Sequence, residues 1–157
     1  MIVLAIDPGT TESGFVVYDT ETKLPLESGK DLNEHVMTYI EHVKWDKLLI
    51  EMVAHYGLGM PAGKTVFETC VWIGRFWQHA FHCKTLPSVR LVYRKEVCLH
   101  LCGSVRAKDK NVIQVLKDRY GGERKISVGT KAAPGPLYGF KADAWQALGV
   151  AVTGVET

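Results

Sequence analysis

Three acidic residues lie in or beside apolar segments, where an isolated carboxylate needs a positively charged partner. Asp7 ends the apolar run 2–7, Glu51 interrupts the apolar run 47–53, and Asp143 precedes an almost wholly apolar segment. A bare carboxylate in a buried strand is costly, so each acid is expected to meet a cation. Together, the three can bind hard cations such as Mg²⁺ and support phosphodiester hydrolysis. Simpler roles stay open: a turn residue at Asp7, and a helix-dipole partner at Asp143.

The segment after Asp7 reads as a tight turn. Pro8 and Gly9 begin it, and a second apolar run, 15–18, leads back. This pattern predicts a hairpin with its acid at the mouth, where the backbone can approach a phosphate or a metal ion closely.

Apolar periodicity and turn residues predict one domain over residues 1–157, of the α/β class. Asp31 is the expected N-cap of the first helix, with Glu34 as its capping-box acid. The order of elements predicts a mixed five-stranded sheet with helices on both faces. The predicted strands are 2–7, 13–18, 25–29, 47–53 and 89–93, and the predicted helices are 32–43, 65–81, 95–101, 108–120 and 142–152.

Charge is unevenly distributed along the chain. Residues 1–60 hold ten acids and four bases, whereas residues 61–157 hold seven acids and fifteen bases. Within 84–131 there are twelve bases and four acids. This asymmetry favours a polyanion-binding face beside an acidic, metal-binding site, although solvated helix faces also carry many bases. No apolar run approaches the ~18 residues of a membrane span, and no export signal is recognisable, so a cytoplasmic location is expected.

Four cysteines, Cys70, Cys83, Cys98 and Cys102, are expected to be reduced core thiols. With the neighbouring histidines they leave a zinc site open, but the sequence has no paired C-x-x-C motif. A P-loop is rejected for the segment 57–65. Five residues separate Gly57 from the Gly-Lys pair and three separate Gly59 from it, where the phosphate cradle requires four.

The order of the acids, on the first strand, a central strand and the last helix, resembles the RNase H-like nuclease superfamily. The residues resemble more closely the RuvC-type Holliday-junction resolvases, in a phage-like branch. The stretches that carry the likeness are Ile6–Gly14, Ile50–Glu51 with Tyr56–Gly57, Ala107–Val112 and Ala142–Thr153.

The resemblance implies a metal-dependent endonuclease that cleaves four-way DNA junctions. Asp7, Glu51 and Asp143 would be catalytic metal ligands, and Lys110 or Lys108 would contact the scissile region, with Lys110 counted as catalytic. Gln146 stands where the family has a further metal-binding position. An amide is a weaker ligand for Mg²⁺ than a carboxylate. The chain therefore departs from the family at the position that would help to bind the second ion. The residues expected to bind DNA are Tyr56, Met60, Lys64, Lys108, Lys110, Lys131 and Lys141.

The implied cofactor is Mg²⁺, as two ions, with Mn²⁺ as a substitute. The implied partner is branched DNA, bound by a homodimer whose two-fold symmetry matches that of a four-way junction. Helix 65–81 is the candidate dimer interface, because its apolar residues cover more than one face; burial in the chain's own core explains the same pattern.

Two other functions stay open at this point. The turn after Asp7 also resembles the phosphate-binding hairpin of sugar kinases and actin-like ATPases, which need a second domain to enclose a nucleotide. Alternatively, the chain binds junctions without cutting them, which Gln146 favours and the three acids oppose.

Overall fold

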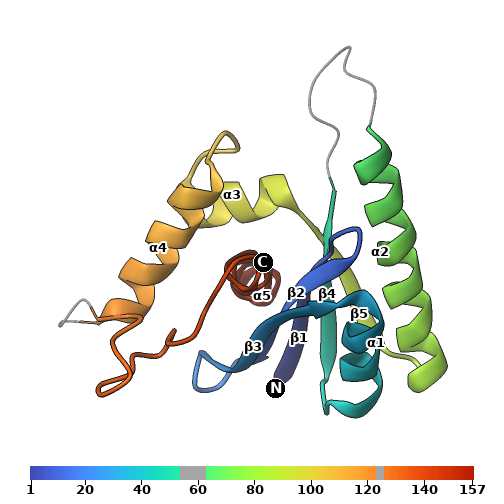
Figure 1. Cartoon of the computed structure of the whole chain (residues 1–157), viewed down its shortest axis with the longest axis horizontal. Helices are drawn as coiled ribbons and strands as arrows, with labels where there is room; N and C mark the ends of the chain where they lie inside the picture. Colours follow the sequence, from blue (N-terminus) through green and yellow to red (C-terminus); the bar gives the residue numbers. More distant parts are fainter. Residues whose placement is uncertain (54–62, 123–125) are drawn as a thin grey trace.

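The computed structural model describes residues 1–53, 63–122 and 126–157 (Figure 1). Its strands are β1 (Ile2–Asp7), β2 (Glu12–Asp19), β3 (Leu24–Leu32), β4 (Lys47–Met52) and β5 (Ser88–Tyr93). Its helices are α1 (Asn33–His42), α2 (Lys64–Cys83), α3 (Arg94–Cys102), α4 (Asp109–Gly121) and α5 (Ala144–Glu156).

The five strands form one mixed sheet in the order β3-β2-β1-β4-β5. β1 pairs antiparallel with β2, as the predicted hairpin requires, and β2 pairs antiparallel with β3. On its other side, β1 pairs in parallel with β4, and β4 in parallel with β5. The carboxyl ends of β1, β4 and β5 therefore meet at one edge of the sheet.

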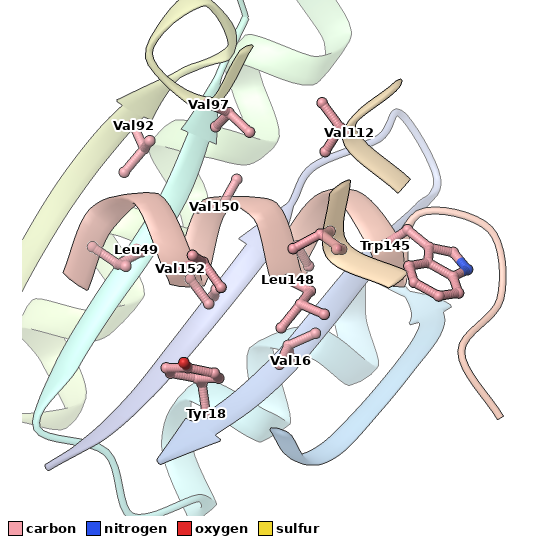
Figure 2. Packing of buried hydrophobic residues seen from close by; sticks show 14 of the residues in the cluster. Val16, Tyr18, Leu49, Val92, Val97, Val112, Trp145, Leu148, Val150 and Val152 are labelled. Carbon is pink, nitrogen blue, oxygen red and sulfur yellow. The ribbon is translucent and has the colours of Figure 1, made fainter. Parts of the chain in front are cut away.

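The central strands are apolar on both faces, and helices cover each face. One face packs against α5, with α3 and α4 outside it; the other packs against α1 and α2 (Figure 1). Successive residues of β4 alternate between the two cores: Leu49 faces α5, whereas Leu48 and Ile50 face α1 and α2. Figure 2 shows α5 lying across the sheet, with Leu148 and Val152 among the side chains in this core.

The predicted fold class and order of elements are confirmed, and two local predictions are wrong. Asp31 does not cap α1, because β3 continues to Leu32, which occupies the N-cap position without a side-chain hydrogen bond. The Asp31 carboxylate instead accepts from the Leu32 N–H at 2.8 Å. The last helix begins at Ala144 rather than at residue 142, because Ala142 has a left-handed φ of 42°.

The cysteines are free thiols on two helices that cover opposite faces of the sheet. Cys70 and Cys83 belong to α2, and Cys98 and Cys102 belong to α3. The glycines of the rejected P-loop, Gly57 and Gly59, lie outside the described residues. None of the described helices combines the length and apolar character needed to cross a membrane.

Candidate active site

Parallel pairing brings Asp7 and Glu51 to the same edge of the sheet. Ile6 of β1 pairs with Ile50 of β4. The residues that follow them, Asp7 and Glu51, therefore lie side by side toward the carboxyl ends of the two strands. Both acids alternate away from Ile6 and Ile50, which pack toward α1 and α2. The two carboxyl groups therefore face the side of the sheet that α5 covers.

Hydrogen bonds between side chains and backbone hold the turn that follows Asp7. The buried Ser13 hydroxyl donates to Asn33 Oδ1 at 2.6 Å and accepts from the Gly9 N–H at 3.2 Å. The Asn33 amide in turn donates to the Gly9 carbonyl at 3.0 Å. This network ties the β1–β2 turn to the start of α1, so the backbone around Asp7 is fixed from two sides.

Asp143 occupies the N-cap position of α5 and makes no side-chain capping bond. Its carboxylate pairs with the ammonium group of Lys30 at 2.9 Å, and Lys30 also lies 3.5 Å from Glu12. The Asp143 carboxylate therefore makes an ion pair in addition to the helix-dipole role left open for it. The ion pair raises the pKa of Lys30, chiefly through the hydrogen bond to Asp143.

Burial and mutual repulsion make Asp7 and Glu51 a proton-sharing pair. Desolvation, followed by the charges of Glu51 and Asp143, raises the pKa of Asp7 to about 9. Desolvation also raises the pKa of Glu51, to about 7, against the opposing charge of Arg94. The metal-free pair therefore retains a proton near neutral pH. A bound cation would relieve both the burial of charge and the repulsion.

Arg94, the first residue of α3, also belongs to this site. Its side chain is 13% exposed. One terminal nitrogen donates to Gln146 Oε1 at 2.5 Å, and the other pairs with Asp109 at the start of α4. The candidate site therefore combines Asp7, Glu51 and Asp143 with two cations supplied by the chain, Arg94 and Lys30.

Comparison with solved structures found matches that include two structures of RuvC of Thermus thermophilus. The structure of that protein matches with a TM-score of 0.69 and 19% identity, over 99% of this chain and 93% of that one. T. thermophilus RuvC in complex with a Holliday junction substrate matches with a TM-score of 0.70 and 16% identity, at the same coverage. The chain has the RuvC fold. No protein-family model and no curated protein matched the sequence.

Within the RuvC fold, the lysines expected at DNA lie in different surroundings. Lys108 and Lys110 flank Asp109, so the Arg94–Asp109 pair connects their segment to the site. Lys141 is exposed two residues before Asp143. The other two are exposed on separate elements: Lys64 pairs with Glu68 at 3.4 Å on α2, and Lys131 lies in the turn 130–133. Tyr56 and Met60 lie outside the described residues.

The two strand-end acids, Asp7 and Glu51, are the residues that fit a divalent cation. Glu51 is 9% exposed, and its buried Oε2 has no hydrogen-bond partner among the residues that the structure describes. A hard cation held by Asp7 and Glu51 would satisfy this oxygen. Over residues 1–53, 63–122 and 126–157, no three His, Cys, Asp or Glu side chains converge as ligands of one ion. Asp143 Oδ2 pairs with Lys30, so the other oxygen of this carboxylate is the one left for an ion.

Sequence reasoning missed Lys30 and Arg94 as individual site residues. Lys30 pairs with Gly14 across β2 and β3, next to the Asp7–Gly14 pair, so only the sheet register identifies it. Arg94 directly follows β5, whose carboxyl end lies at the edge that Asp7 and Glu51 share. Its place after the third parallel strand was the available signal.

Proposed function

We propose that the chain is a metal-dependent endonuclease, a single domain over residues 1–157, that hydrolyses phosphodiesters of four-way DNA junctions. We place it in the cytoplasm, in the phage-like branch of the RuvC-type resolvases. The observation that carries the proposal is the meeting of Asp7 and Glu51 at one sheet edge, beside Asp143. There, Glu51 has a buried oxygen without a hydrogen-bond partner in the described part of the chain. The chain-wide likeness to a RuvC bound to a Holliday junction supports the choice of substrate.

The residues of the site divide into those that hold a cation and those that adjust charge. Asp7 and Glu51 would hold Mg²⁺ or Mn²⁺, with Asp143 as a third ligand. Such an ion, when bound, supplies Lewis-acid chemistry for phosphodiester hydrolysis. Before it binds, the Asp7–Glu51 pair retains a proton that the ion displaces. Lys30 holds the Asp143 carboxylate in place beside the pair through their ion pair.

Lysines near the start of α4 are suited to bind the DNA backbone. Lys108 and Lys110 are exposed on either side of Asp109, which Arg94 anchors at the site. Ammonium groups neutralise phosphates as point charges, which gives affinity without sequence preference. We therefore assign Lys110 to the DNA strand near the site and Lys108 to the flanking backbone.

A homodimer is the proposed assembly, with α2 as its interface. Ile73 and Phe76 of α2 are buried in the chain's own core, but Phe67 and Val71 are 63% and 61% exposed. Gly74 follows one turn after Val71, and a Cβ there would meet nothing within 4 Å. This exposed apolar stripe suits a second copy of the same helix, and a two-fold pair of sites suits a four-way junction.

The test is cleavage of a synthetic four-way junction by the full chain in Mg²⁺ or Mn²⁺, with a linear duplex of matched sequence as the control substrate. We expect the junction to be cut and the duplex to be left intact. Asp7→Asn, Glu51→Gln and Asp143→Asn should each abolish cleavage while junction binding persists. Glu21→Gln, in the turn at the opposite edge of the sheet, is the matched control and should cleave normally. Near-normal turnover by Asp7→Asn would contradict the proposed chemistry.

A second candidate is a junction-binding protein that does not cut. The Arg94–Gln146 bond favours it, because the site then lacks the further carboxylate that the resolvase resemblance leads us to expect. The same experiment separates the two: binding of the junction without cleavage in either metal would favour the non-cutting protein.

A further inference from the structure

Arg94 reaches the acidic site because of where β5 ends. Val92 of β5 pairs with Glu51 of β4 and packs on the face that α5 covers. Arg94 comes two residues later, as the first residue of α3, and its hydrogen bond to Gln146 of α5 places its side chain on the same face. At 13% exposure it is largely withdrawn from water. A guanidinium is always charged, so a permanent positive charge lies beside Asp7 and Glu51.

Both terminal nitrogens of the Arg94 guanidinium make contacts. One terminal nitrogen donates to Gln146 Oε1 at 2.5 Å, and the other pairs with Asp109. Its charge also acts on both strand-end acids, because it lowers the pKa of Asp7 and of Glu51 against the effect of burial. One guanidinium therefore connects the acids at the sheet edge with α4 and α5.

The amide of Gln146 fits this guanidinium better than it fits a metal ion. Its carbonyl oxygen already accepts from Arg94, and its –NH₂ group cannot bind a cation. A divalent ion brought to Gln146 would have to share this oxygen with Arg94 and bear repulsion from the guanidinium charge. The carbonyl oxygen of Gln146 therefore already has a donor from the chain, whereas Glu51 Oε2 has none among the described residues.

We propose that Arg94 is a resident cation of the site, which holds Gln146 and excludes a divalent ion there, so that each chain binds one ion, at Asp7 and Glu51. This inference rests on the proposed function, and it replaces the sequence-based expectation of two ions with Gln146 as a ligand. Arg94 is a positioning residue in this account, because it acts on the metal site through Gln146 and through its charge.

The experiment counts ions rather than turnover. Mn²⁺ is titrated into the full chain, and bound Mn²⁺ is determined by electron paramagnetic resonance of the free ion. The wild-type chain should bind one Mn²⁺ at Asp7 and Glu51, and Asp7→Asn should lose that site. The double variant Arg94→Gln with Gln146→Glu, which removes the resident charge and adds a carboxylate of equal reach, should bind two ions.

Single variants separate charge from structure. Arg94→Lys keeps the charge and should retain one ion with little change in Kd. Arg94→Gln should bind its one ion about tenfold more tightly, because a nearby positive charge has been removed. Asp109→Asn loses the contact to α4 but keeps Arg94, so its stoichiometry should stay at one. Circular dichroism melting of each variant checks that the chain is folded.

Failure of this inference is distinguishable from failure of the proposed function. Two ions on the wild-type chain, or one on the folded double variant, would overturn the role of Arg94 even if the junction is cut. A wild-type chain that binds no ion and cuts no junction would overturn the proposed function, and this inference with it.

Discussion

Gly14 and Asp143 are in direct backbone contact. A Cβ placed on Gly14 would lie 2.4 Å from the carbonyl carbon of Asp143 and 2.5 Å from its oxygen, distances that no side chain tolerates. Gly14 also pairs with Asp7 across β1 and β2. The absence of a side chain at this position therefore lets the start of α5 approach β2 and brings Asp143 beside the acids at the sheet edge.

Gly14→Ala should impair the site more than the fold. The added methyl must push the first turn of α5 away from β2, which moves Asp143 relative to Asp7 and Glu51. We expect a loss of about 1–3 kcal/mol in the free energy of unfolding, typical of overpacking. We also expect junction cleavage to fall by about 100-fold, as small misplacements of catalytic groups do.

The matched control for Gly14→Ala is Gly63→Ala. Gly63 has an ordinary extended backbone (φ −73°, ψ 165°) and a Cβ there meets nothing within 4 Å, so this variant should cleave normally. Equal cleavage by both alanine variants would show that the Gly14–Asp143 approach is not needed.

Asp7→Asn should stabilise the metal-free chain at alkaline pH. Folding raises the pKa of Asp7 to about 9 and that of Glu51 to about 7. Such groups contribute stability below their unfolded pKa, near 4, and that contribution is lost as the pH rises through 7 to 9. In EDTA, the wild-type free energy of unfolding should therefore fall from pH 5 to pH 9. Asn carries no charge, so the variant should lose less and be more stable by about 1–3 kcal/mol at pH 9.

Urea unfolding at pH 5, 7 and 9, followed by circular dichroism, measures this difference. Adding Mg²⁺ should restore stability to the wild-type chain at pH 9 and have little effect on Asp7→Asn. If the two chains keep the same pH profile in EDTA, the pKa of Asp7 is not raised as its burial and its acidic neighbours indicate.

How far the sequence predicts this site depends on which contacts are local. Asp7 and Glu51 could be assigned because each follows or interrupts its own apolar strand. Lys30 and Arg94 were not assigned, because their roles depend on which strands are neighbours. Lys30 reaches the site only through the pairing of β3 with β2, and Arg94 only because β5 lies beside β4.

The wrong prediction at Asp31 has the same origin. An Asp ahead of an amphipathic run is a good N-cap by local rules, but here β3 continues through Asp31 to pair Leu32 with Glu12. The next residue, Asn33, is then buried, and its side chain holds the turn after Asp7. Tertiary pairing thus overrides a local signal.

Lys108 and Lys110 should account for a measurable part of the salt dependence of junction binding. Each neutralised phosphate contributes about −0.9 to the slope of log K against log salt concentration. Replacing both lysines with Ala should flatten that slope by about 1–2 units, measured by gel shift or anisotropy between 50 and 200 mM salt. Lys23→Ala, in the turn at the far edge of the sheet, should leave the slope unchanged. A slope that is the same in all three chains would remove these lysines from the DNA interface.

Val71→Asp should turn the proposed dimer into a monomer. Val71 is 61% exposed at the centre of the apolar stripe with Phe67 and Gly74. The introduced carboxylate would therefore face the same carboxylate of the second copy across a two-fold axis. Like charges in a closing apolar interface cost enough to separate the chains. Light scattering after size-exclusion chromatography measures the mass. Leu86→Asp, at an apolar residue that is 91% exposed outside α2, adds the same charge and should leave the dimer intact. A dimer that survives Val71→Asp would place the interface elsewhere than on α2.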